Sequence, residues 1–134
     1  MRQVHNPDIV PPFGPYCHAV EVGPGDSLLA FSGLVGCERD GTLPADAGAQ
    51  TSLILQTLAQ LLAAEGLGTE NVGKLNFFVL RREDLPAIRA ARDTWLGDHR
   101  PAMSLVLVAG LGSEDWLLEV DGFAVRPAAP EAAE

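Results

Sequence analysis

The stretch that decides the fold is His99-Arg100-Pro101-Ala102-Met103-Ser104-Leu105-Val106-Leu107-Val108. Pro101 has no N–H group and disfavours helical geometry in the residue before it, so a preceding helix must end there. The apolar run Leu105–Val108 is long enough for a buried strand. The chain is therefore predicted to pass from helix to strand within these ten residues.

A second strand is predicted from Trp116 to Val125. In this strand Glu119 and Asp121 alternate with apolar residues, so both carboxylates point to the same side. We expect the two strands to be neighbours, with Met103, Ser104 and Leu105 close to Glu119.

Two helices are predicted upstream of these strands. The first runs from an N-cap at Asp46 to Gly66, where glycine suits the left-handed position that follows a helix. The second covers Leu85–Leu96, with Asp84 as its cap and Gly97 at its end. Leucines at helical spacing give the first helix one apolar face.

Three further strands are expected. Tyr16–Val22 and Ser27–Ser32 flank a glycine-rich turn and are predicted to pair as a hairpin, after an extended proline-rich arm over residues 1–15. Val72–Leu80 carries apolar residues on both sides, which argues that both of its faces are covered. The predicted order is β-β-α-β-α-β-β, an α+β fold in which two helices cover one face of a mixed sheet. No element is left to cover the other face, so we expect self-association.

Composition limits the partners. Nine basic residues against eighteen acidic ones give a net charge of −9, which disfavours nucleic acid because that affinity comes largely from lysine and arginine. No apolar run approaches the roughly 20 residues that span a bilayer, so no membrane partner is expected. The absence of an apolar leader and the presence of only two cysteines favour a cytoplasmic location. Residues 1–126 are predicted to form a single domain, and residues 127–134 a disordered tail.

No metal is expected. His5, His18 and His99 lack metal-ligand spacing, and no cluster of cysteines or acids completes a set. Cys17 and His18 are a possible nucleophile and base, but adjacent residues of a strand point to opposite faces.

Several motifs, in the same order, resemble the RidA/YjgF family. Residues 99–104 are similar to the family's His-Arg-Pro-Ala-Arg-Ser, and Phe13–Val20 is similar to its Gly-Pro-Tyr-Ser-Gln-Ala-Val opening. Phe31-Ser32-Gly33 resembles its Val-Ser-Gly-Gln, and Asp46–Gln50 resembles its segment before a long helix. The resemblance implies a chorismate-mutase-like fold assembled as a homotrimer, with the sheets inward and a small-molecule cleft at each subunit interface.

The resemblance also assigns roles to single residues. In deaminating members, water hydrolyses an imine or enamine without a cofactor, and Glu119 matches the glutamate that holds the water or transfers protons. Tyr16 and Ser32 match residues that line the cleft, and Gly33 lets a ligand approach the backbone. On their own, Glu119 is also typical of a solvated strand face, Tyr16 of a half-buried aromatic and Ser32 of a strand end.

Met103 is the point at which the chain departs from the family. An arginine in this place binds the substrate carboxylate through two hydrogen bonds, which a thioether cannot do. Leu105 replaces a small thiol residue, so the pocket wall becomes more apolar. Arg89 on the second helix is a candidate to restore the missing charge, or it simply lies on a solvated helix face.

Two functions follow as hypotheses. The first is a RidA-like hydrolase or deaminase of an imine, enamine or related reactive intermediate, other than a simple 2-imino acid because of Met103. The alternative is a non-catalytic ligand-binding or stabilising trimer. A ribonuclease activity, which has been described for some members of the family, is disfavoured by the charge.

Overall fold

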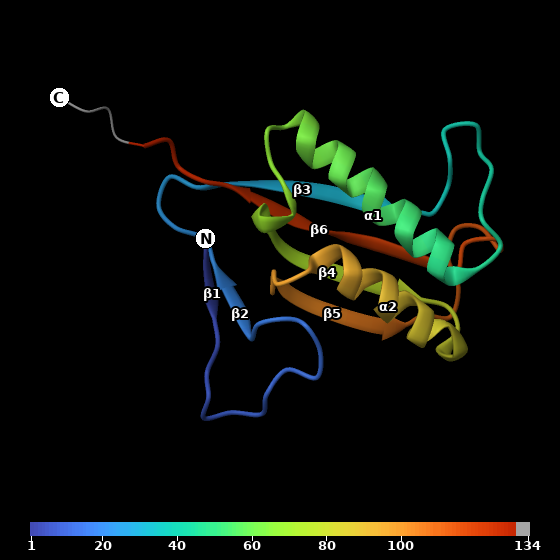
Figure 1. Ribbon diagram of the computed structural model, residues 1–134, viewed down its shortest axis with the longest axis horizontal. Coiled ribbons are helices and arrows are strands. Elements are labelled where there is room, and N and C mark those ends of the chain that lie inside the picture. Colours follow the sequence, from blue (N-terminus) through green and yellow to red (C-terminus); the bar gives the residue numbers. More distant parts are fainter. Residues whose placement is uncertain (131–134) are drawn as a thin grey trace.

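The computed structural model describes residues 1–130, which form a four-stranded mixed sheet with both helices on one face (Figure 1). The elements are β1 (Arg2–Val4), β2 (Ala19–Glu21), β3 (Ser27–Leu34), α1 (Ala47–Ala64), β4 (Val72–Val79), α2 (Leu85–Leu96), β5 (Ala102–Leu107) and β6 (Leu118–Arg126), with short 3-10 turns at Thr69–Asn71 and Arg82–Asp84. The predicted α+β fold is confirmed.

The order of strands in the sheet is β3-β6-β4-β5. β5 runs parallel to β4, with Met103 beside Leu75, whereas β6 is antiparallel to β4, with Glu119 beside Phe78. The expectation that β5 and β6 are neighbours is therefore wrong, because β4 lies between them. The reason is the crossover through α2, which returns β5 parallel to β4 and leaves the other side of β4 for β6.

The predicted hairpin between the first two strands is also wrong. The turn forms, with the Asp26 amide donating to the Gly23 carbonyl oxygen at 3.2 Å. However, β3 pairs with β6, and β2 pairs with β1, which lies inside the arm that was expected to be irregular. A three-residue strand such as β1 is too short to produce a periodic signal in the sequence.

The helix boundaries agree with the sequence, but one cap does not. The Asp46 carboxylate accepts a hydrogen bond from the Ala49 amide at 2.8 Å, and Gly66 has a φ of 72° just after α1, as expected. Asp84 makes no capping hydrogen bond to α2. Its carboxylate instead pairs with the Arg81 guanidinium at 2.8 Å, because the 3-10 turn before α2 turns it toward that side chain.

The core lies between the two helices and one face of the sheet. Ile54 and Leu58 of α1 and Ile88 of α2 are fully buried against Phe77 and Val120 of the sheet. Large apolar residues that alternate along β4 therefore account for the packing on this side.

The other face of the sheet, which we call the open sheet face, has no helix over it in the single chain (Figure 1). Leu28 of β3 and Val106 of β5 lie on it and are 56% and 47% exposed. The cross-strand register adds Lys74, Asn76, Phe78, Ser104, Glu119 and Asp121 to this face. The expectation that one face stays uncovered within the chain agrees with this arrangement.

Asp26 ties both ends of the described chain to the turn before β3. Its carboxylate accepts hydrogen bonds from the Ala128 amide at 2.8 Å and from the terminal ammonium group of Met1 at 3.0 Å. These bonds, the Ala128 amide first, hold the pKa of Asp26 below its ordinary value. Of the predicted tail, residues 131–134 lie outside the described residues. Within the described part, no helix is long and apolar enough to cross a membrane.

Gly122 offers a test of the sheet. A Cβ at this position would overlap the backbone carbonyl oxygen of Lys74 on β4, and its φ of 157° is one that other residues rarely adopt. We expect Gly122→Ala to lower the free energy of unfolding by roughly 3 kcal/mol, measured by urea denaturation.

Gly110 is the matched control, because nothing lies within 4 Å of a Cβ placed there. Gly110→Ala should leave stability unchanged or slightly raised. Equal stability of the two variants would contradict the close β4–β6 approach.

Candidate functional site

A pocket of about 400 Å³ opens at the outer edge of β5, where α2 and the loop before β2 meet it. It is lined by residues 13–16 of the loop, by Arg89, Arg92 and Asp93 of α2, and by residues 103–105 of β5. Four of the residues singled out in the sequence, Tyr16, Arg89, Met103 and Leu105, therefore lie around one cavity. We call it the edge pocket.

The loop that carries Tyr16 is held in place by backbone contacts. The Cys17 amide donates to the Pro101 carbonyl oxygen at 3.0 Å, which joins this loop to the start of β5. The Tyr16 hydroxyl accepts a hydrogen bond from the Phe13 amide at 3.0 Å, so its own proton remains for another acceptor. Gly14 permits this fold of the loop, since a Cβ there would come within 2.9 Å of the Tyr16 ring.

Arg92 is the residue that reasoning from the sequence missed. Its side chain is only 6% exposed, and its Nη1 lies 3.6 Å from the Met103 Sδ. Arg89 also lines the edge pocket, but from an exposed position. The available signal was the position of Arg92 on the apolar stripe of α2, in line with Ile88 and Leu96.

The remaining predicted site residues lie on β3 and β6. Ser32 and Gly33 form a bulge opposite Asp121, because the register shifts between Phe31 and Leu34. A Cβ on Gly33 would come within 2.5 Å of the Glu119 carboxyl carbon, so glycine makes room for this half-buried side chain.

Within one chain the residues of the edge pocket are separate from the predicted site residues on β3 and β6. Glu119 points to the open sheet face, and Met103 lies on the helix side of β5, with β4 between the two strands. Two strand spacings, about 10 Å, therefore separate them, in addition to the thickness of the sheet. The expectation that Met103 and Leu105 lie close to Glu119 is wrong for the single chain.

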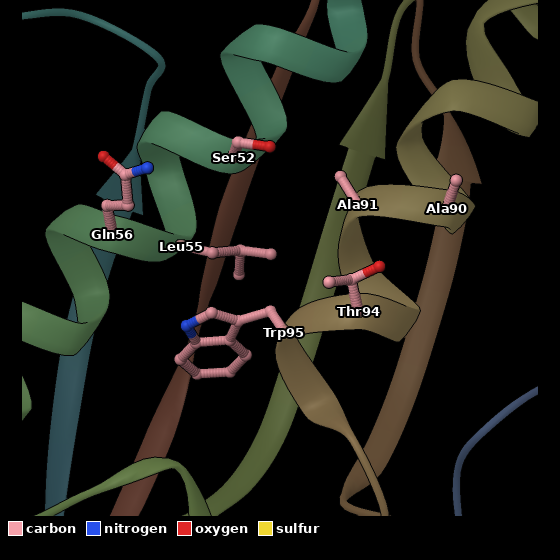
Figure 2. Close-up of a pocket in the computed structure, with 7 residues that line it drawn as sticks. All are labelled: Ser52, Leu55, Gln56, Ala90, Ala91, Thr94 and Trp95. Atoms are coloured by element: carbon pink, nitrogen blue, oxygen red, sulfur yellow. The ribbon is translucent and has the colours of Figure 1, made fainter.

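A second hollow, of about 370 Å³, lies between the two helices (Figure 2). Ser52, Leu55 and Gln56 come from α1, and Ala90, Ala91, Thr94 and Trp95 come from α2. Figure 2 shows the Trp95 ring reaching toward Leu55. None of these side chains is ionisable, so this hollow offers no acid, base or charged anchor.

Cys17 and His18 are bound to separate partners. The Cys17 thiol donates to the Ala19 carbonyl oxygen at 3.0 Å, whereas the His18 ring contacts the Asn6 amide at 3.0 Å and the Val10 carbonyl oxygen at 2.7 Å. They therefore do not form a nucleophile and base with each other. Across residues 1–130, no three side chains of histidine, cysteine, aspartate or glutamate gather as a metal site.

Residues 8–126 match the family described as endoribonuclease L-PSP. The chain belongs to this family. It is the RidA/YjgF family whose motifs the sequence resembles, and the match covers the sheet, both helices and the edge pocket.

Individual relatives agree with this assignment. The chain is 30% identical over 112 residues to the 3-aminoacrylate deaminase RutC of Acinetobacter baylyi. The aligned part covers 82% of this chain and 86% of that protein. Among solved structures, the Rid-family protein YyfB of Yersinia pestis, of unknown function, has a TM-score of 0.80 at 28% identity and covers 92% of this chain and 96% of that one. E. coli TdcF with bound serine has a TM-score of 0.70 at 30% identity and covers 87% and 91%.

The contact between Arg92 and Met103 leads to a prediction. Met103→Arg would place a second guanidinium beside the first in a buried position, without a new carboxylate to neutralise it. We expect a loss of roughly 3 kcal/mol in the free energy of unfolding, measured by urea denaturation.

Met103→Leu is the control for the change in shape, and it should cost less than about 1.5 kcal/mol. If Met103→Arg were as stable as Met103→Leu, residue 103 would not face Arg92.

Proposed function

We propose that this protein is a RidA-type hydrolase that deaminates an imine, an enamine or a related reactive intermediate. The observation that carries the proposal is the edge pocket, where Tyr16, Met103 and Leu105 lie together beside two arginines. The motifs of the sequence predict these three residues as cleft residues. The similarity to a 3-aminoacrylate deaminase supports the same class of reaction.

The proposed reaction needs only water and a group that moves protons. Glu119 takes a proton from water as the oxygen attacks the imine carbon, and it returns the proton to the nitrogen. This gives a carbinolamine, whose hydroxyl proton passes by way of Glu119 to the nitrogen as the carbon–nitrogen bond breaks, so that ammonia and a carbonyl compound leave. An enamine enters the same route after protonation at carbon converts it to the imine. No metal or organic cofactor takes part in this scheme.

A homotrimer is part of the proposal because one chain does not bring Glu119 to the edge pocket. The open sheet face is uncovered and carries Glu119 together with the exposed Leu28 and Val106. Apolar side chains are also exposed beside the edge pocket, with Phe13 at 87%. Packing the open sheet face of one copy against the pocket edge of the next would cover both and complete a cleft, in which Ser32 and Gly33 would lie beside Glu119.

The substrate is proposed to differ from a simple 2-imino acid. Met103 carries no charge at the position that corresponds to the family's carboxylate-binding arginine, and Leu105 makes the pocket lining more apolar. A cytoplasmic location and the lack of a nucleic-acid partner stay predictions from the sequence.

The role of Glu119 is tested by comparing Glu119→Gln with Asp121→Asn. We expect Glu119→Gln to lower kcat by about 10²- to 10⁴-fold, because the amide cannot take a proton from water. Ammonia release from a panel of imines and enamines generated in the assay by an amine oxidase and a lyase measures this.

Asp121 is the matched control, because it lies on the same strand face as Glu119. Its carboxylate accepts a hydrogen bond from the Asn76 side-chain amide at 2.8 Å, and the amide oxygen of an asparagine at position 121 can accept the same bond. Asp121→Asn should retain activity within about threefold. Full activity of Glu119→Gln would remove Glu119 from the reaction. A panel that gives no turnover, although ligands bind, would favour the alternative of a non-catalytic ligand-binding or stabilising trimer.

The assembly is tested by mass in solution. Analytical ultracentrifugation should give three times the 14.2 kDa of one chain. Val106→Arg should shift the protein to monomers, because it places a charge in the proposed contact. Ala63→Arg, on the exposed surface of α1, should remain trimeric. A monomeric wild-type protein at micromolar concentration would contradict the assembly.

A further inference from the structure

Arg92 is a buried charge beside an open cavity. Its side chain is 6% exposed, and the residue lines the edge pocket together with Tyr16 and Met103. A buried guanidinium is costly unless its donors are satisfied by acceptors of opposite charge. The contacts of each guanidinium nitrogen therefore show which of them has an acceptor within the protein and which is left for a ligand.

One carboxylate holds the near end of the guanidinium. The Nε donates to the Asp93 Oδ1 at 2.9 Å, but Asp93 is 52% exposed and lies next to Arg92 in the chain. The pair therefore fixes the direction of the guanidinium more than it compensates for burial. The two Nη groups at the far end point away from this carboxylate.

The two Nη groups of Arg92 have poor acceptors among residues 1–130. Nη1 meets the Met103 Sδ at 3.6 Å, and a thioether is a weak acceptor. Nη2 makes no hydrogen bond with any of residues 1–130, and it lies 3.6 Å from the place that a Cβ on Gly14 would occupy. Among the described residues, no fully buried side-chain nitrogen lacks a hydrogen-bond partner. Because Nη2 has no partner, it is not fully buried and retains access to the cavity. Glycine at position 14 keeps the space in front of it free.

We infer that Arg92 is the anion anchor of the edge pocket and binds a carboxylate of the substrate through Nη1 and Nη2. Tyr16 is placed to donate its free hydroxyl proton to the same ligand. This inference rests on the proposed function for the nature of the substrate, but the binding itself does not depend on turnover. The positive anchor of the pocket thus lies on α2 and contacts Met103 of β5.

The position of the charge sets the class of substrate. A carboxylate bound by Arg92 is held from α2, whereas an arginine at residue 103 would hold it from β5. An enamine acid carries both the carboxylate that this anchor would bind and the enamine of the proposed reaction, so it is the class of substrate that the two together favour. The exposed Arg89 adds charge at the rim of the pocket without fixing the carboxylate.

The test uses crotonate and crotonamide, an isosteric pair with the flat carbon skeleton of such an enamine acid and no leaving amine. Binding is followed by NMR titration of the backbone amides of Gly14 and Ser104. Wild-type protein should bind crotonate about tenfold more tightly than crotonamide, because charge-assisted hydrogen bonds form only with the carboxylate. Added salt should weaken the binding of crotonate and leave that of crotonamide unchanged.

The variants separate the two arginines. Arg92→Met should bind both compounds equally and have unchanged or higher thermal stability, because an apolar side chain replaces a buried charge. Arg92→Lys should keep part of the preference for crotonate, and Arg89→Gln should keep all of it. Retention of the preference in Arg92→Met, or its loss in Arg89→Gln alone, would overturn the inference. So would a wild-type protein that binds the two compounds equally.

A double variant distinguishes the loss of the charge from a loss of folding. Arg92→Met combined with Met103→Arg moves the charge across the 3.6 Å contact and removes the repulsion between guanidinium groups. It should recover a preference for crotonate over crotonamide. Failure of the imine assay together with a preserved Arg92 effect would reject the hydrolase and keep the anion site, whereas the opposite result would reject the anion site alone.

Discussion

The parallel pairing of β5 with β4 is the constraint on which the rest of the structure depends. The crossover through α2 returns β5 parallel to β4, with Met103 beside Leu75. Because β6 takes the other side of β4, β5 lies at the edge of the sheet. An edge strand leaves one side free, and here the loop of residues 13–16 and the outer surface of α2 meet it to form the edge pocket. The same pairing puts β4 between the pocket and Glu119, so the candidate site residues are divided between two surfaces.

This division gives the uncovered sheet a functional meaning. Large apolar side chains exposed on a sheet face favour its burial against another surface, and Leu28 and Val106 are exposed on the open sheet face. Glu119 lies on it beside Gly33, whose missing side chain leaves space for the carboxyl group. Association of copies would therefore satisfy packing and assemble the proposed catalytic cleft by the same contact.

The pair of Arg92 and Met103 gives the edge pocket a buried positive charge that comes from α2. The guanidinium reaches residue 103 from α2, one turn beyond the apolar residue Ile88. Asp93 holds its Nε and so directs its other nitrogens into the cavity. A buried cation with a weak thioether partner is costly for stability, and such a cost is more readily understood in a ligand site than in a core.

Much of the fold could be predicted from local patterns. Asp46 and Gly66 mark the ends of α1 because capping depends on neighbouring backbone groups, and Pro101 separates α2 from β5 for the same local reason. The family assignment also came from short motifs, whereas the uncovered face of the sheet followed from the number of predicted helices. Local signals fail where the partner is distant in the chain. β1 has only three residues, and its pairing with β2 depends on where the loop between them returns.

The candidate site divides in the same way. Tyr16, Met103 and Leu105 were named from motifs, and they share one pocket. The sequence by itself determined the residue types and the elements that carry them, because caps, periodicity and motifs act over a few residues. Only the tertiary structure decided that β4 separates Glu119 from Met103 and that Arg92, rather than Arg89, is the buried arginine, because strand order and burial arise from contacts between distant segments.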